Sequence, residues 1–311
     1  MRPRPESEAA PGRLPTEVGS PLGDQGSTLR VQVITDSTAA IPADLRAAHH
    51  IVSVPLNVVM GHQSISEDNL DEVDFYEHLA HGDPPVTTTQ PPLDRMRAAL
   101  AAPAARGQDT VGVFISADLS GTFSAATLAR EMVLAEHPQA TIELIDSRTA
   151  AMHLGLGVLA AAKASQAGAC VADVVATAHS TLARTRILFI PATLEYLRRG
   201  GRIGGAAALL GTLLRITPVL TTADGLAAVY KKVRTRARAV SEMLAAFSAD
   251  IASRGLEEVV VEYSREEAAA SDLARLAHER CGRLPRILPI PAVIGVHVGP
   301  GAVALVWTTR D

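Results

Sequence analysis

Short apolar runs alternate with amphipathic segments through the first half of the chain. The apolar, β-branched runs that predict buried strands lie at residues 29–34, 110–115 and 141–145. The segments with helical periodicity lie at residues 71–80, 93–102, 124–135 and in the small-residue stretch that ends at residue 163. Strands that alternate with helices predict a parallel sheet flanked by helices, with ligand groups at the carboxyl ends of the strands.

The pattern changes near Ile187 and predicts a mixed sheet for the second half. A strand at 187–190 precedes a short helix at 194–199, which Gly200-Gly201 can end with a left-handed residue. The further strands that we expect are 216–221 and 226–233, joined as a hairpin, then 258–263, 293–297 and 302–307. The further helices that we expect are 206–214, 235–253 and 264–278, the last opened by a capping box at Ser264.

These elements predict an α/β protein of two domains. The first, residues 30–185, has a mainly parallel sheet flanked by helices, and the second, residues 186–311, is an α/β sandwich with a mixed sheet. Residues 1–29 contain five prolines and four glycines without an apolar core, so we expect a disordered tail rather than a signal peptide. The sequence has two cysteines and no apolar stretch of membrane-spanning length, which favours the cytoplasm.

Composition narrows the class of ligand. A formal net charge of −4 argues against a nucleic-acid-binding protein, which usually has a basic face. Hydrophobic residues make up 47% of the chain but aromatic residues only 3%, so any internal cavity must be lined mainly by aliphatic side chains. Such a lining suits an alkyl chain better than a nucleobase, which usually stacks on an aromatic ring.

Four polar patches interrupt this aliphatic chain, each beside glycine or proline. They are Thr88-Thr89-Gln90-Pro91, Leu119-Ser120-Gly121-Thr122, residues 196–203 and His297-Val298-Gly299-Pro300-Gly301. Hydroxyl and imidazole groups donate hydrogen bonds to a carboxylate without supplying a full counter-charge. The second patch precedes a predicted helix, whose free N–H groups also attract anions. None of the patches pairs a nucleophile with a base, so we expect capture of an anionic head group rather than bond cleavage.

Several better-known motifs do not account for the chain. Residues 155–160 match the letters of a dinucleotide fingerprint, but they do not directly follow a strand, and we interpret them as a helix-packing segment. The sequence lacks a P-loop, a G-x-S-x-G elbow, an H-E-x-x-H motif and paired cysteines. We therefore predict no metal site, no cofactor and no catalytic residues.

Taken together, the polar patches resemble those of the DegV family of bacterial fatty-acid-binding proteins. The resemblance covers roughly residues 30 to 308. Besides the four patches, it rests on residues 34–38, 145–147 and 216–220. Its most specific parts are Gly200-Gly201-Arg202-Ile203 and the terminal His297-x-Gly-Pro-Gly. The resemblance implies two α/β domains with a lipid tunnel between them.

The resemblance also implies roles for individual residues. Thr88 or Thr89, Ser120 and His297 correspond to the carboxylate contacts, with Gly121 and Thr122 beside them, and Arg202 corresponds to an arginine linked to phosphoryl transfer. The chain departs from the family at Thr89, where serine is usual, and at Ala117-Asp118, where Ser-Gly is common. An acidic side chain facing an anion site would be unfavourable, so we expect Asp118 to point outward.

The function that the resemblance implies is that of a carrier. It would bind a long-chain fatty acid and present the carboxylate to a separate ATP-binding kinase subunit, which forms the acyl phosphate. Two alternatives remain open: a small-molecule kinase or transferase subunit related to dihydroxyacetone kinases, and a lipid-responsive regulator whose partner is not a kinase.

Overall fold

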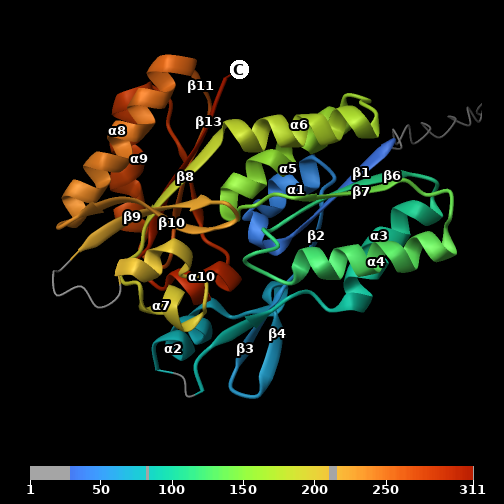
Figure 1. Ribbon diagram of the computed structural model, residues 1–311, viewed down its shortest axis with the longest axis horizontal. Coiled ribbons are helices and arrows are strands. Elements are labelled where there is room, and N and C mark those ends of the chain that lie inside the picture. The colour runs from blue at the N-terminus through green and yellow to red at the C-terminus, as the bar shows by residue number, and fades with distance from the viewer. Residues whose placement is uncertain (1–28, 82–83, 210–215, 311) are drawn as a thin grey trace, which may run out of the picture.

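Helices and sheets are stacked in five layers in the computed structural model, which describes residues 29–81, 84–209 and 216–310. A four-stranded sheet and a six-stranded sheet share a central layer of two helices, and each sheet has two further helices on its other face. Figure 1 shows this order from α8 and α9 at one end to α3 and α4 at the other. The α/β class predicted from the sequence is confirmed.

The four-stranded sheet is entirely parallel, as the alternation of strands and helices predicts. Its strands, in the spatial order β2-β1-β6-β7, are β2 (Val52–Val54), β1 (Val31–Asp36), β6 (Asp109–Phe114) and β7 (Ile142–Asp146). One face packs on α3 (Leu93–Ala105) and α4 (Thr122–Glu136), where Phe114 belongs to the same core cluster as Met96 and Leu100. Both faces are covered, which explains why the strands read as continuous apolar runs.

The central layer consists of α5 (Ala151–Gln166) and α6 (Val171–Arg184). One core cluster includes Val33 of the first sheet, Leu154 of α5 and Val306 of the second sheet. In α5, a Cβ at Gly155 would lie 2.3 Å from the carbonyl oxygen of Ala39, and a Cβ at Gly157 would lie 2.8 Å from the Leu182 side chain. The interpretation of these glycines as a helix-packing segment is therefore confirmed.

The six-stranded sheet is mixed, with one parallel pair. Its strands, in the spatial order β10-β9-β8-β13-β11-β12, are β10 (Leu226–Val233), β9 (Thr217–Ala223), β8 (Thr185–Ile190), β13 (Val303–Thr309), β11 (Leu256–Tyr263) and β12 (Arg286–Pro289). Only β11 and β12 run parallel to each other among the described pairs. The outer face packs on α8 (Arg236–Arg254) and α9 (Glu267–Cys281), where the rings of Phe247 and Trp307 meet edge to face.

The hairpin between β9 and β10 joins the second half of the chain to the first. Its turn is Asp224-Gly225, with φ of 50° and 82°, the positive values that a two-residue turn of type I′ requires. The Gly225 carbonyl accepts a 2.8 Å hydrogen bond from the Ser116 hydroxyl, just beyond β6. The turn therefore fixes the edge of one sheet against the loops of the other.

A small antiparallel sheet lies at the lower end of Figure 1. It contains β4 (Gln63–Ser66), β3 (Asn57–Met60) and β5 (Thr87–Thr89). Its core cluster includes residues of α2 (Glu72–His81) and α10 (Ala292–Val298), among them Phe75 and Val296. This cluster brings the fourth polar patch, near the end of the chain, beside the first.

The remaining short elements connect these layers. They are η1 (Ser37–Ala39), α1 (Ala43–Ala48), η2 (Glu67–Asn69), α7 (Glu195–Arg199) and η3 (Gly204–Leu209). Gly201, with φ of 70°, follows α7 as the predicted left-handed residue. Where we expected a helix at 206–214, the structure has η3, and residues 210–215 lie outside the described residues. The predicted tail also lies outside them except for Leu29, and the division at residue 185 stays a prediction.

Two predicted elements are wrong. Residues 293–297 form helix α10 rather than a strand, because Pro291 supplies the N-cap backbone and the short β-branched run packs against α2 and β3. The capping box is also wrong: the helix begins at Glu267, while Ser264 is buried and its N–H donates to the Ala302 carbonyl. Both errors arise because contacts distant in sequence override a local pattern.

None of the described helices combines the length and the apolar character needed to cross a bilayer.

The close approach of α5 to Ala39 can be tested with Gly155→Ala. Alanine normally stabilises a helix relative to glycine by about 1 kcal/mol. Here the added Cβ would overlap a backbone carbonyl, so we expect a loss of about 1–3 kcal/mol in the free energy of unfolding, measured by urea denaturation. Gly205→Ala, whose Cβ has no neighbour closer than 3.8 Å, is the matched control. A Gly155→Ala variant as stable as the wild type would contradict this packing.

Candidate functional site

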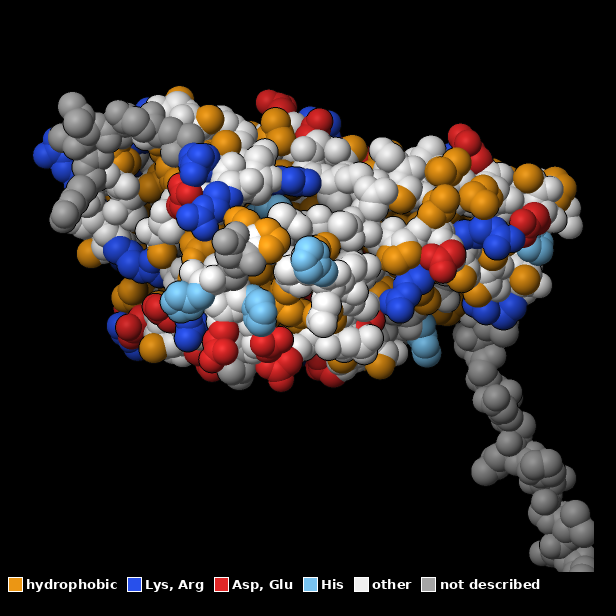
Figure 2. Space-filling view, turned by 90° about the horizontal axis from the view of Figure 1, so that it is seen from below, with side chains coloured by type: hydrophobic (Ala, Val, Ile, Leu, Met, Phe, Trp, Pro, Cys, Tyr) orange, Lys and Arg blue, Asp and Glu red, His pale blue; other side chains and the backbone are white. Residues whose placement is uncertain are grey.

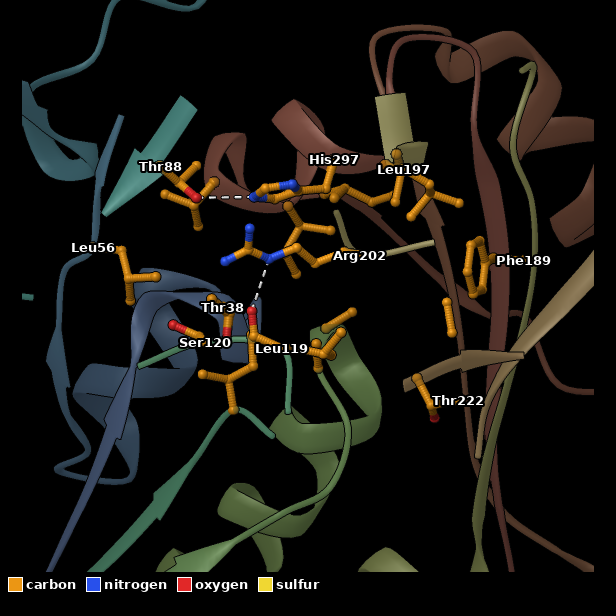
Figure 3. Close-up of a pocket in the computed structure, with 18 of the residues that line it drawn as sticks. Thr38, Leu56, Thr88, Leu119, Ser120, Phe189, Leu197, Arg202, Thr222 and His297 are labelled. Atoms are coloured by element: carbon orange, nitrogen blue, oxygen red, sulfur yellow. Dashed lines mark hydrogen bonds between the residues drawn. The ribbon is translucent and has the colours of Figure 1, made fainter. Parts of the chain in front are cut away.

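A cavity of about 520 Å³ lies between the two large sheets and the small one. Its wall combines the carboxyl edge of the parallel sheet, the inner face of the mixed sheet, and helices α7 and α10 (Figure 3). Most of the lining is aliphatic, including Leu56, Ile115, Ile187, Leu197 and Val293. The residue classes of the lining are therefore those that the composition predicts.

One end of the cavity carries a hydrogen bond between the first and fourth polar patches. Thr88 of β5 and His297 of α10 are 209 residues apart, yet the Thr88 hydroxyl and the His297 Nε2 atom lie 2.9 Å apart. Figure 3 shows both side chains at the same rim of the cavity. The bond depends on the small sheet and α10 packing together, which no local sequence pattern specifies.

The His297 ring is held neutral. Burial, and to a smaller extent the positive charge of Arg202, lowers the pKa of His297 to about 4. Its Nδ1 atom is buried without a hydrogen-bond partner among the described residues. A Cβ at Gly200 would lie only 2.2 Å from this atom, so glycine is needed there for the ring to occupy its place.

Arg202 joins the two halves of the chain at this end of the cavity. Its Nε atom donates to the Leu119 carbonyl at 3.0 Å (Figure 3), and its Nη1 atom donates to the Gly200 carbonyl at 2.6 Å. Both partners are neutral carbonyl groups, and Arg202 has no ion-pair partner among the described residues. The guanidinium therefore retains a net positive charge toward the cavity.

The second polar patch forms the start of α4. Ser120 and Gly121 line the cavity, whereas Thr122 is fully buried and lies behind them. The Ser120 and Thr122 hydroxyls are 2.8 Å apart, so Thr122 orients the serine. A Cβ at Gly121 would lie 2.0 Å from the Gln90 Oε1 atom, which shows how closely the first and second patches approach each other.

The structure thus brings together six of the seven site residues expected from the sequence. Thr88, Thr89, Ser120, Gly121, Arg202 and His297 all line the cavity, and Thr122 does not. That these residues contact a ligand stays a prediction. Asp118 is half-exposed and lies 3.6 Å from Arg148, in agreement with the expectation that it points outward.

Other polar residues at strand ends hold the loops instead of lining the cavity. The buried Asp36 carboxylate accepts hydrogen bonds from the N–H groups of Thr38 and Ile115, and its burial raises its pKa. Asp146 accepts from the N–H groups of Ala117 and Arg148. Their position at the carboxyl edge was predicted, but their hydrogen bonds are structural.

Three polar lining residues were missed by the sequence analysis: Thr38, Thr222 and Glu262. Glu262 lies on β11 and is completely buried, and burial raises the pKa of its carboxyl group to about 8. Its only signal in the sequence is an acidic residue at the end of the buried run Val259-Val260-Val261. Thr222 lies near the end of the hairpin strand β9 and gives no such signal.

The arrangement favours an anionic head group attached to an apolar body. Hydroxyl groups, a neutral imidazole and a guanidinium lie at one end, and mostly aliphatic side chains line the rest. Within the described ranges, no group of three or more His, Cys, Asp or Glu residues is placed to hold a metal ion. Figure 2 shows that Lys and Arg side chains on the face seen from below form separate patches with acidic and apolar groups between them, unlike a nucleic-acid-binding surface.

Comparison with known sequences gives one consistent result. A family model described as that of uncharacterised proteins of the DegV family matches residues 30–310. A DegV domain-containing protein of Clostridium perfringens is 41% identical over 283 residues, which cover 91% of this chain and 100% of the relative.

Solved structures agree with the sequence comparison. The structure describing fatty acid binding by a DegV family protein of Thermus thermophilus has a TM-score of 0.81 at 30% identity, covering 90% of this chain and 99% of that chain. DegV of Bacillus subtilis, described as a fatty acid binding protein, has a TM-score of 0.80 at 28% identity, covering 91% and 100% respectively.

The lowered pKa of His297 predicts a pH-dependent contribution to stability. Between pH 6.5 and about 4 the unfolded chain binds a proton at this residue and the folded chain does not, so acidification destabilises the folded state. Glutamine does not titrate. The unfolding free energy of the wild type minus that of His297→Gln should therefore fall by up to roughly 3 kcal/mol as the pH is lowered through this window.

Urea denaturation of both proteins at several pH values measures this difference. A difference that stays constant from pH 7 to pH 4 would show that the His297 ring is not held neutral by burial.

Proposed function

The chain belongs to the DegV family, and we propose that it binds one long-chain fatty acid in this cavity and presents the carboxylate to a separate ATP-dependent kinase. The fatty-acid-binding relatives from Thermus thermophilus and Bacillus subtilis, which have the same fold, support the ligand class. The observation that carries the proposal is the convergence of Thr88, His297 and Arg202 at one end of an aliphatic cavity.

The polar end suits a carboxylate. A buried carboxylate is costly unless hydrogen-bond donors replace its water. The Ser120 and Thr88 hydroxyls supply such donors, with the neutral His297 ring donating its Nε2–H to the Thr88 oxygen so that the Thr88 hydroxyl is free to donate to the anion. The charge of Arg202 also stabilises the anion. The N–H groups at the start of α4 add a favourable dipole beside Ser120.

The aliphatic wall supplies the affinity. Burying each methylene group contributes about 0.8 kcal/mol, so an acid with roughly fourteen methylenes gains about 11 kcal/mol before the cost of association. The head-group contacts then orient the ligand, with its carboxylate beside Arg202.

Phosphorylation requires a partner under this proposal. The sequence has no P-loop to hold ATP, and the Thr88–His297 pair is assigned to binding the carboxylate rather than to attack on it. Arginine is suited to an acyl phosphate, because its planar guanidinium forms paired hydrogen bonds with phosphate oxygens. We assign Arg202 to the charge that develops when the kinase transfers the phosphoryl group.

The proposal also covers the cellular location and the domain organisation of the protein. We place the protein in the cytoplasm, in keeping with the free thiols of Cys170 and Cys281. We further propose that residues 30–185 and 186–311 are two domains with the lipid site between them, because the lining residues come from both ranges.

Binding can be tested directly by native mass spectrometry of the protein as purified. We expect a retained long-chain acid and release of that acid on delipidation.

In Ser120→Ala and Thr88→Val, affinity for palmitic acid should fall about tenfold each, since each variant removes one hydrogen bond to a charged group. Thr177→Val, on the remote helix α6, is the control. If the delipidated wild-type protein binds no fatty acid, the proposal is wrong.

The role of Arg202 can be separated from binding. With palmitic acid, ATP, Mg²⁺ and a fatty acid kinase subunit, Arg202→Gln should reduce acyl phosphate formation about a hundredfold and weaken binding by less than about tenfold. Acyl phosphate is trapped with hydroxylamine, and Arg275→Gln on α9 is the control. Formation of acyl phosphate from ATP by the chain alone would favour the enzyme alternative.

A further inference from the structure

Glu262 is a buried carboxyl group in the wall of the cavity that the head-group chemistry does not use. It lies on β11, on the face of the mixed sheet that meets α5, and its side chain is completely covered. Its Oε1 atom accepts a hydrogen bond from the Met152 N–H at 3.1 Å. Its Oε2 atom has no hydrogen-bond partner among the described residues.

Capping a helix explains only one of these two oxygens. The Met152 N–H belongs to the first turn of α5 and needs an acceptor, which Oε1 provides. A carboxyl group buried among apolar side chains is protonated, and with Oε1 accepting, the proton is on Oε2. Oε2 is therefore a buried hydrogen-bond donor without an acceptor, a state that proteins rarely leave uncompensated.

Small residues share the cavity wall with this donor. Ala304 is the direct cross-strand neighbour of Glu262 and shares its face of the sheet. Ala150, Ala151 and Ala302 line the cavity as well. These methyl side chains give the carboxyl group apolar surroundings, and the carboxyl group is one of the few polar groups in this part of the cavity wall.

Glu262 is distinct from the head-group end. Among the described residues, no hydrogen bond connects it with Ser120, Arg202 or His297. An acyl chain anchored by its carboxylate at that end runs through the aliphatic part of the cavity, and Glu262 is part of the same wall. Under the proposed function, the part of the ligand that reaches Glu262 is therefore the acyl chain and not the carboxylate.

We propose that Glu262 forms a second polar subsite, which hydrogen-bonds an oxygen atom carried on the acyl chain, so that the cavity prefers hydroxy or oxo fatty acids to unsubstituted ones. This inference rests on the proposed function and specifies its ligand class. A hydroxyl or ketone oxygen accepts the Oε2–H bond, whereas a plain methylene leaves the donor unpaired. Sites with a buried polar group discriminate strongly against ligands that cannot pair with it.

Isothermal titration of the delipidated full chain tests the inference. The ligands are stearic acid, stearic acids hydroxylated at carbons along the middle and far parts of the chain, and 12-oxostearic acid. At least one oxygenated acid should bind about tenfold more tightly than stearic acid, equal to about 1.4 kcal/mol. If stearic acid binds as tightly as every oxygenated acid, the inference is overturned while the proposed function stands. If none of the acids binds, both fail.

Variants assign the preference to Glu262. Glu262→Met removes the donor and should abolish the preference, measured as the ratio of two affinities on the same protein, so that a general loss of stability cancels. Glu262→Gln keeps an N–H donor and should therefore retain the preference for oxygenated acids. Thr222→Val, which changes another polar lining residue, should also leave it intact. A preference that survives Glu262→Met, or disappears in Thr222→Val, would overturn the assignment. Glu262→Leu, which also removes the donor, repeats the test if the methionine variant does not fold.

Discussion

The hydrogen bond between Thr88 and His297 is the contact on which the polar end of the cavity depends. It joins β5 to α10, and through them the small sheet to the last helix of the chain. An apolar cavity can accept a charged head group only if donors are already in place, because it offers no water to replace them. The neutral ring, the close approach of Gly200 and the neighbouring Arg202 charge together arrange such donors before a ligand arrives.

The rest of the fold fixes the positions of the two sides of this cavity relative to each other. The helices α5 and α6 pack on both large sheets, so neither sheet can move without repacking a shared core. Two hydrogen bonds also connect the two sides of the cavity. Arg202 donates to the Leu119 carbonyl, and the Ser116 hydroxyl donates to the Gly225 carbonyl in the hairpin turn. Each crosses from one half of the chain to the other, and each lies near the start of α4, where we propose that the carboxylate binds.

Much of this arrangement could be predicted from the sequence, since it follows from local patterns. The parallel sheet follows from the alternation of elements, and the hairpin from Asp224-Gly225. The polar patches beside glycine contain most of the residues that form the polar end of the cavity. The resemblance to a known family supplied the link between them, because residues 209 positions apart leave no periodic signal.

What could not be predicted depends on contacts between distant segments. The run at 293–297 reads as a strand and becomes helix α10 only because Pro291 and the small sheet hold it. Thr122 has the right neighbours in sequence but is turned behind Ser120. Glu262 looks like an ordinary acidic residue near a strand end, and only the packing of α5 over β11 makes it a buried carboxyl group in the cavity wall.

A crystal structure of the protein with palmitic acid tests the central claim most directly. We expect a single extended ligand, with its carboxylate within hydrogen-bonding distance of the Ser120 hydroxyl and the Thr88–His297 pair, and its alkyl chain along the aliphatic lining of the cavity. A ligand bound outside this cavity, or bound with its carboxylate away from these residues, would contradict it.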